Sequence, residues 1–70
     1  MLKVGKMYRS VNTGSLAVRI KAIMSKDTSG AYYKVDWYTE DAMTKKLTVY
    51  NTDQEYYCSR DMESGWKQIE

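Results

Sequence analysis

The fold of this chain is decided by the stretch Tyr33-Lys34-Val35-Asp36-Trp37-Tyr38. Apolar and aromatic residues alternate here with charged ones, which is the pattern of a strand with one face in the core and the other toward water. Most of the stretch consists of β-branched or aromatic residues, which favour strands. The stretch therefore predicts a strand that turns Tyr33, Val35 and Trp37 toward the core.

Two further stretches show the same period of two. Leu16, Val18 and Ile20 alternate with more polar neighbours, and the pattern slips by one residue near Ala22, where we expect a β-bulge. A third strand is expected over residues 46–50. There Leu47 and Val49 would point inward, while Lys46, Thr48 and Tyr50 would point outward.

Shorter strands are expected at the two ends of the chain. Residues 6–10 precede a turn-forming cluster, Asn12-Thr13-Gly14-Ser15, and would form a first strand that is joined by this turn to the second. Residues 66–69 would form a closing strand, with Trp66 over the core.

The segment after Asn51 can be interpreted in two ways. Thr52-Asp53-Gln54-Glu55 matches a capping box, and Gly65 lies where a glycine would end a helix. The apolar stripe between them is ragged, which favours only a short helix or 3₁₀ turn over residues 60–64. The alternative is an α+β fold, in which a helix over residues 53–64 packs on a four-stranded sheet.

Five short strands with one helical turn before the last resemble the SH3-like small barrel, the architecture shared by SH3, Tudor and KOW modules. The opening residues 4–9 resemble the first strand of small barrel proteins from bacteria and their phages, and residues 59–66 resemble the closure by a 3₁₀ turn and a strand. The resemblance implies a single all-β, five-stranded barrel over residues 1–70. It assigns no binding residues, because the SH3, Tudor and KOW binding motifs are absent.

The expected core collects the inward positions of all these strands. Its members are Val4, Leu16, Val18, Ile20, Ile23, Tyr33, Val35, Trp37, Leu47, Val49, Trp66 and Ile69.

The composition of the chain excludes most kinds of catalytic site, metal site and covalent cross-link. The chain has 70 residues, no histidine and a single cysteine, so catalytic triads, zinc sites and internal disulfides cannot form. Arg60 lies two residues after Cys58, but Glu55 and Asp61 also flank the cysteine and oppose a lowered pKa, so we expect a partly buried, unreactive thiol. We therefore expect no enzyme, no cofactor and no metal.

No apolar run is long enough for a membrane span or a signal peptide, so the expected location is the cytoplasm.

The aromatic residues suggest a binding face. The chain contains seven tyrosines and two tryptophans but no phenylalanine, which is typical of rings that lie between core and water. The outward positions of three neighbouring strands would present cations and rings on one face. This candidate binding face comprises Arg19, Lys21, Lys34, Tyr38, Lys46 and Tyr50.

Two functions fit these features. The first is a non-catalytic module that binds a host or cellular protein, such as a phage-type regulator or inhibitor acting in the host cytoplasm. The alternative is weak, sequence-tolerant binding of single-stranded nucleic acid across the basic and aromatic face. Residues 1–50 carry a net charge of 9 − 4 = +5 and residues 51–70 a net charge of 2 − 5 = −3. A solvated surface with internal charge pairing explains that polarity equally well.

Overall fold

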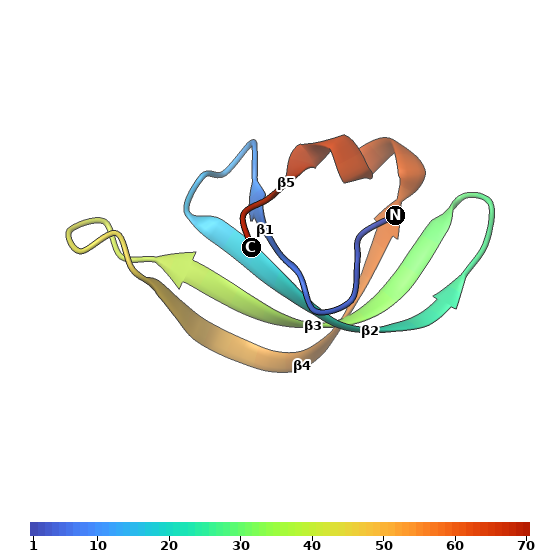
Figure 1. The fold of residues 1–70 in the computed structure, drawn as a ribbon, viewed down its shortest axis with the longest axis horizontal. Helices are drawn as coiled ribbons and strands as arrows, with labels where there is room; N and C mark the ends of the chain where they lie inside the picture. The colour runs from blue at the N-terminus through green and yellow to red at the C-terminus, as the bar shows by residue number, and fades with distance from the viewer.

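The computed structural model describes residues 1–70 and consists of five strands and one short helix (Figure 1). The elements in chain order are β1 (Met7–Ser10), β2 (Leu16–Lys26), β3 (Gly30–Glu40), β4 (Leu47–Ser59), the 3₁₀ helix η1 (Arg60–Gly65) and β5 (Trp66–Gln68).

All five strands belong to one antiparallel sheet with the order β4-β3-β2-β1-β5. The predicted all-β class, the five strands and the helical turn directly before the last strand are confirmed. The bulge expected near Ala22 is also present, since the register between β2 and β3 shifts between Ile20 and Ala22.

The sheet is not closed into a barrel, so that part of the expectation is wrong. β5 has only three residues and pairs with β1 alone, whereas β4 has thirteen residues and pairs with β3 alone. β4 and β5 therefore form the two edges of an open, curved sheet. Figure 1 shows η1 and the N-terminal segment above the concave side of that sheet.

The alternative with a helix over residues 53–64 is wrong, because Thr52 to Glu55 continue the strand. β3 extends from Gly30 to Glu40 and offers hydrogen-bonding partners along the whole of β4, with Gln54 opposite Val35 and Cys58 opposite Ala31. A capping box contributes only about 0.5–2 kcal/mol, so a sheet ladder of this length overrides it.

The core lies on the concave face of the sheet. Its cluster of buried residues consists of Leu2, Tyr8, Val18, Ile20, Ala31, Tyr33, Val35 and Cys58. The expected core positions Val18, Ile20, Tyr33 and Val35 are confirmed. The expected positions Leu16, Ile23, Trp37, Leu47 and Trp66 are half-buried.

Val4 and Ile69 do not belong to the core, contrary to the prediction. The N-terminal chain turns sharply at Lys3–Lys6, where the Lys6 amide donates to the Lys3 carbonyl oxygen and Gly5 has a φ of +85°. Val4 lies at the corner of that turn and is exposed, so Leu2 enters the core instead. The Leu2 amide donates a hydrogen bond to the Tyr33 hydroxyl over 3.1 Å, and this bond holds the N-terminal segment against β3. Ile69 lies beyond the end of β5.

Val49 is also exposed, because the inward positions of β4 are set by its second half, where Tyr56 and Cys58 face the core. β4 has one extra residue between Gln54 and Asn51 and another, Tyr50, between Asn51 and Val49. Each shift of one residue moves the following side chains to the opposite face of a strand, so the two shifts cancel. Val49 therefore shares the outward face with Tyr38 rather than the inward face with Val35.

Truncating Val35 and Val49 to Ala should distinguish a buried from an exposed valine by the same chemical change. Val35 is 0% exposed and Val49 is 42% exposed. We expect Val35→Ala to lower the free energy of unfolding by about 2 kcal/mol and Val49→Ala by less than about 1 kcal/mol. Urea denaturation measures both, and equal losses would contradict this placement of β4.

Candidate functional site

The longest strand of the chain is β4, which pairs on one side only and exposes eight of its thirteen residues. Its exposed residues are Thr48, Val49, Tyr50, Asn51, Thr52, Asp53, Glu55 and Tyr57, and we call them the β4 edge. The strand contains no lysine, arginine or proline along its thirteen residues. Those residue types commonly keep edge strands from pairing with other chains, and β4 has in their place two register shifts and the charged residues Asp53 and Glu55.

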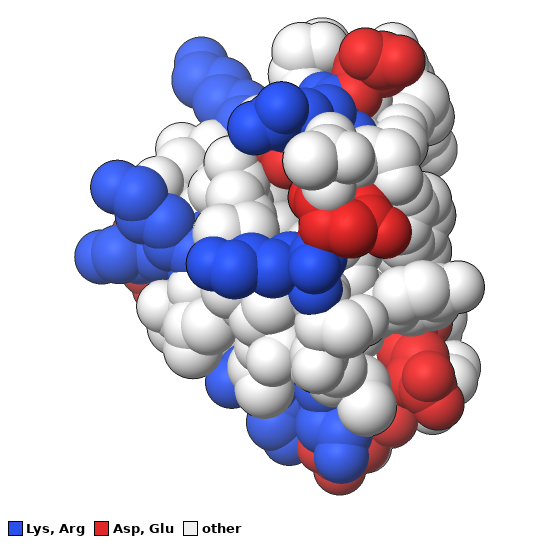
Figure 2. Space-filling model, turned by 90° about the vertical axis from the view of Figure 1, so that its right-hand side faces the viewer, with Lys and Arg blue, Asp and Glu red and all other residues white.

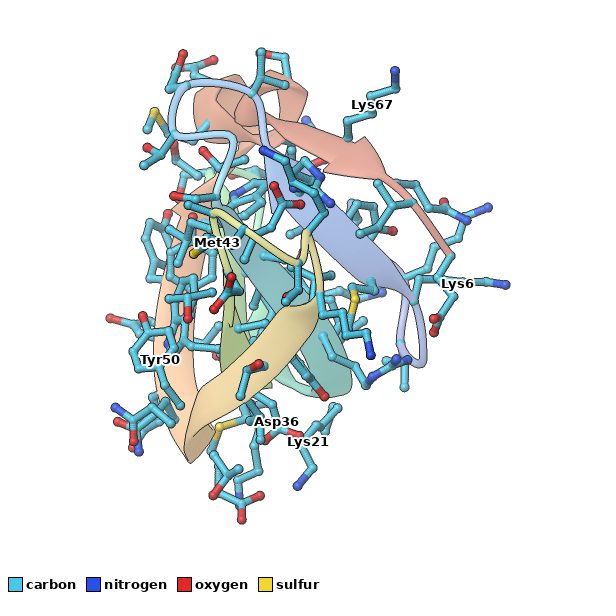
Figure 3. All side chains as sticks on the ribbon, turned by 90° about the vertical axis from the view of Figure 1, so that its left-hand side faces the viewer. Lys6, Lys21, Asp36, Met43, Tyr50 and Lys67 are labelled. Carbon is cyan, nitrogen blue, oxygen red and sulfur yellow. The ribbon has the colours of Figure 1, made fainter.

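The opposite edge of the sheet is short and rich in lysine. β5 offers three residues, of which Lys67 is exposed, and Lys3 and Lys6 lie in the segment that leads into β1. None of these lysines belongs to any of the five ion pairs. Figure 3 shows Lys6 and Lys67 pointing away from the body of the molecule on the side opposite Tyr50. Lysines of this kind disfavour strand addition at β5.

The structure brings four of the six predicted binding residues to the outward face. Arg19 lies opposite Asp36, Tyr38 opposite Ala17 and Lys34 opposite Ala22, while Lys21 lies at the bulge of β2. The other two are separate from this group. Lys46 precedes β4 in the hairpin, and exposed Tyr50 is an extra residue in β4.

Carboxylates partly neutralise that outward face. The Arg19 guanidinium pairs with the Glu70 carboxylate over 2.7 Å, and Lys21 pairs with two aspartates. Cations held by internal carboxylates are less available to phosphate groups than free ones. Nucleic-acid binding through this face stays a prediction; Lys34 is its predicted cation outside the ion pairs, and Lys46, which is also unpaired, lies apart from it.

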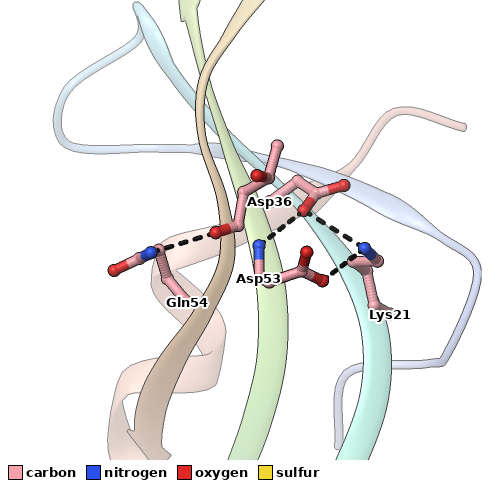
Figure 4. Close-up of polar contacts among 5 residues, drawn as sticks. Lys21, Asp36, Asp53 and Gln54 are labelled. Atoms are coloured by element: carbon pink, nitrogen blue, oxygen red, sulfur yellow. Dashed lines mark hydrogen bonds and ion pairs between the residues drawn. The ribbon is translucent and has the colours of Figure 1, made fainter.

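The two aspartates and Lys21 form a polar node across three neighbouring strands (Figure 4). Lys21 Nζ of β2 lies 2.6 Å from Asp53 Oδ1 of β4 and 3.7 Å from Asp36 Oδ1 of β3. The same Asp36 oxygen accepts the backbone N–H of Asp53 over 3.0 Å. Asp53 has a φ of +54°, a backbone state that aspartate tolerates better than most residues. The node therefore holds an irregular point of β4 in place.

Charge pairing in this node changes two pKa values in opposite directions. The hydrogen bond from Lys21 lowers the pKa of Asp53, and the same bond raises the pKa of Lys21. Both groups are exposed, so solvent screens the pair and its contribution to stability is small.

Sequence reasoning missed an exposed aromatic pair on the outward face. The rings of Tyr32 in β3 and Tyr57 in β4 lie with centroids 4.9 Å apart and an interplanar angle of 53°. Alternation with Lys34 already places Tyr32 on that face, but Tyr57 needed the full length of β4. Gly30 makes room for the pair, because a Cβ there would lie 2.7 Å from the Tyr57 hydroxyl and 2.5 Å from the Cys58 carbonyl oxygen.

A second aromatic cluster links the two edges on the concave side. The ring centroids of Trp37 and Tyr56 are 5.1 Å apart, and those of Tyr56 and Trp66 are 6.0 Å apart. Trp66 Nε1 donates to the Tyr56 hydroxyl over 3.0 Å. β4 and β5 thus meet through side chains instead of backbone hydrogen bonds.

The lone thiol is buried among apolar groups. Cys58 belongs to the core cluster, as expected for a structural cysteine, and burial raises the pKa of its thiol. No cluster of three or more Cys, Asp or Glu side chains could hold a metal ion. The structure also has no helix with the length and apolar character that crossing a membrane requires.

Charge is distributed unevenly over the surface. At the end of the molecule seen in Figure 2, Lys and Arg lie mainly toward the left of the view and Asp and Glu mainly toward the right. Within β4 itself the only charged residues are Asp53 and Glu55, so the β4 edge is acidic.

Comparison of the chain with models of protein families, with curated proteins and with solved structures gave no match.

Replacing Lys21 should move the titration of Asp53. Lys21 favours the ionised carboxylate, so the pKa of Asp53 in the folded chain lies below its ordinary value of about 3.9. The stabilisation is present above about pH 3.9 and is lost as the pH falls through the lowered pKa. We expect the side-chain carboxyl signal of Asp53 in an NMR titration to move to a higher midpoint in Lys21→Met. An unchanged midpoint would contradict the node.

Proposed function

We propose that this chain is a non-catalytic protein-binding module whose β4 edge pairs with an extended segment of a partner protein. The observation that carries the proposal is the asymmetry of the two edges. β4 offers thirteen residues without lysine or proline, whereas β5 offers three residues beside free lysines. Strand addition supplies main-chain hydrogen bonds from the edge and selectivity from the alternating side chains.

The surroundings of β4 support binding without a large rearrangement. β3 lies along its whole length, the polar node holds Asp53, and the Tyr56–Trp66 hydrogen bond holds the strand from the concave side. An edge fixed in an extended conformation loses little conformational entropy when a partner strand is added.

The biological role follows the same proposal. The strand order and the 3₁₀ turn before the last strand support the resemblance to the SH3-like architecture, here with an open sheet. A small module of this kind would act as a phage-type regulator or inhibitor by occupying a strand-binding region on a host protein in the host cytoplasm.

Lysine substitutions on the two edges test the proposal with matched chemistry. The double variant Val49→Lys, Thr52→Lys adds two lysines to the β4 edge and is called the β4 variant. The single variant Gln68→Lys adds one lysine to the β5 edge. Each immobilised variant is exposed to a bacterial lysate, after circular dichroism has confirmed its fold. We expect the parent and Gln68→Lys to capture the same stoichiometric partner and the β4 variant to lose it.

Two results would contradict the proposal. One is retention of the partner by the β4 variant at the level of the parent. The other is recovery of no stoichiometric protein by the parent chain.

A further inference from the structure

The chemistry of the partner strand can be inferred from the side chains that already face β4. Across the pair β3–β4, Lys34 lies directly opposite Glu55 and Tyr32 directly opposite Tyr57. These are an opposite-charge pair and an aromatic pair, two of the kinds of cross-strand neighbour that stabilise sheets. β3 thus presents an aromatic residue and a basic residue two positions apart on one face.

The free side of β4 leaves the same two side chains open to a second neighbour. Glu55 is exposed and belongs to none of the five ion pairs, and Tyr57 is 41% exposed. A strand that adds to β4 would continue the cross-strand rows Lys34–Glu55 and Tyr32–Tyr57 by one position each.

We propose that the β4 edge selects an extended segment that carries a basic side chain beside Glu55 and an aromatic or β-branched side chain beside Tyr57. In an antiparallel partner this reads aromatic-x-Lys/Arg, the order that Tyr32-Tyr33-Lys34 has in β3. The inference rests on the proposed function, since it names the partner of the same edge.

Charge also decides against two other occupants of this edge. A second copy pairing β4 against β4 would have no lysine or arginine to place beside Glu55, because the only charged residues of the strand are Asp53 and Glu55. Like charges placed opposite one another destabilise a sheet. A nucleic acid would bring phosphates against the same carboxylates. A basic protein segment is the occupant with complementary charge.

Two synthetic peptides test the selectivity. The first probe is Thr-Thr-Tyr-Thr-Lys-Thr-Val, and the second has Glu in place of Lys; both have blocked termini. Each is titrated into the ¹⁵N-labelled full chain, and the amide signals of residues 47–59 report binding at β4. We expect the Lys probe to bind about three- to tenfold more tightly than the Glu probe at low salt, with a smaller ratio at about 0.5 M salt.

Variants of the chain assign that preference to one carboxylate. Glu55→Lys should reverse the preference between the two probes, and Glu55→Gln should reduce it toward parity. Asp61→Lys is the matched control, because it makes the same charge change at an exposed carboxylate outside β4 and belongs to no ion pair. It should keep the preference of the parent.

The outcomes separate this inference from the proposed function. Equal binding of both probes at β4, or a preference that Glu55→Lys leaves unchanged, overturns the inference and leaves strand addition standing. Absence of any shift at residues 47–59 with either probe overturns both. Concentration-dependent dimerisation through β4 in the unliganded chain would also overturn the inference, because a second copy would then be the occupant.

Discussion

The length of β5 is the constraint on which the rest of the structure depends. Three residues pair with the end of β1 and cannot extend far enough to meet β4, so the sheet stays open. A five-stranded meander with a longer last strand could close and leave no edge unpaired. Here the closing strand stops early, and the thirteen residues of β4 keep a row of backbone groups without a partner strand.

An open edge is useful for recognition only if its shape is fixed, and two sets of contacts fix β4. On the convex side, Lys21 and Asp36 hold the residue with positive φ in its middle. On the concave side, Tyr56 packs between Trp37 and Trp66 and accepts a hydrogen bond from the latter. The strand is therefore curved and held from both faces, while only its free side and several side chains face solvent. A curved and fixed edge of this kind favours binding of one partner segment. It disfavours the aggregation that is typical of long, flat edge strands.

The sequence predicts the strands and the class of fold well, because period-two alternation is local. The expected core positions Val18, Ile20, Tyr33 and Val35 are buried, and the short helical turn expected over residues 60–64 is present as the 3₁₀ helix Arg60–Gly65. Val49 could not be placed correctly, since its face is set by the second half of β4 and by two register shifts that become visible only in the pairing with β3. The sequence also could not show that β4 continues through the capping-box residues 52–55, because the strand that pairs with them, β3, lies elsewhere in the chain. Four residues of the expected binding face do share a face, but the β4 edge required the open topology, which no local pattern encodes.

Native-state hydrogen exchange along β4 tests the central claim most directly. In an edge strand, alternate amides donate to the neighbouring strand and the others face solvent, so protection should have a period of two. We expect alternate amides of residues 54–59, where the register against β3 is regular, to exchange at least about tenfold faster than their neighbours, while β3, which is paired on both sides, is protected continuously. Continuous protection of β4 at the level of β3 would show a partner strand on its free side and would contradict the account.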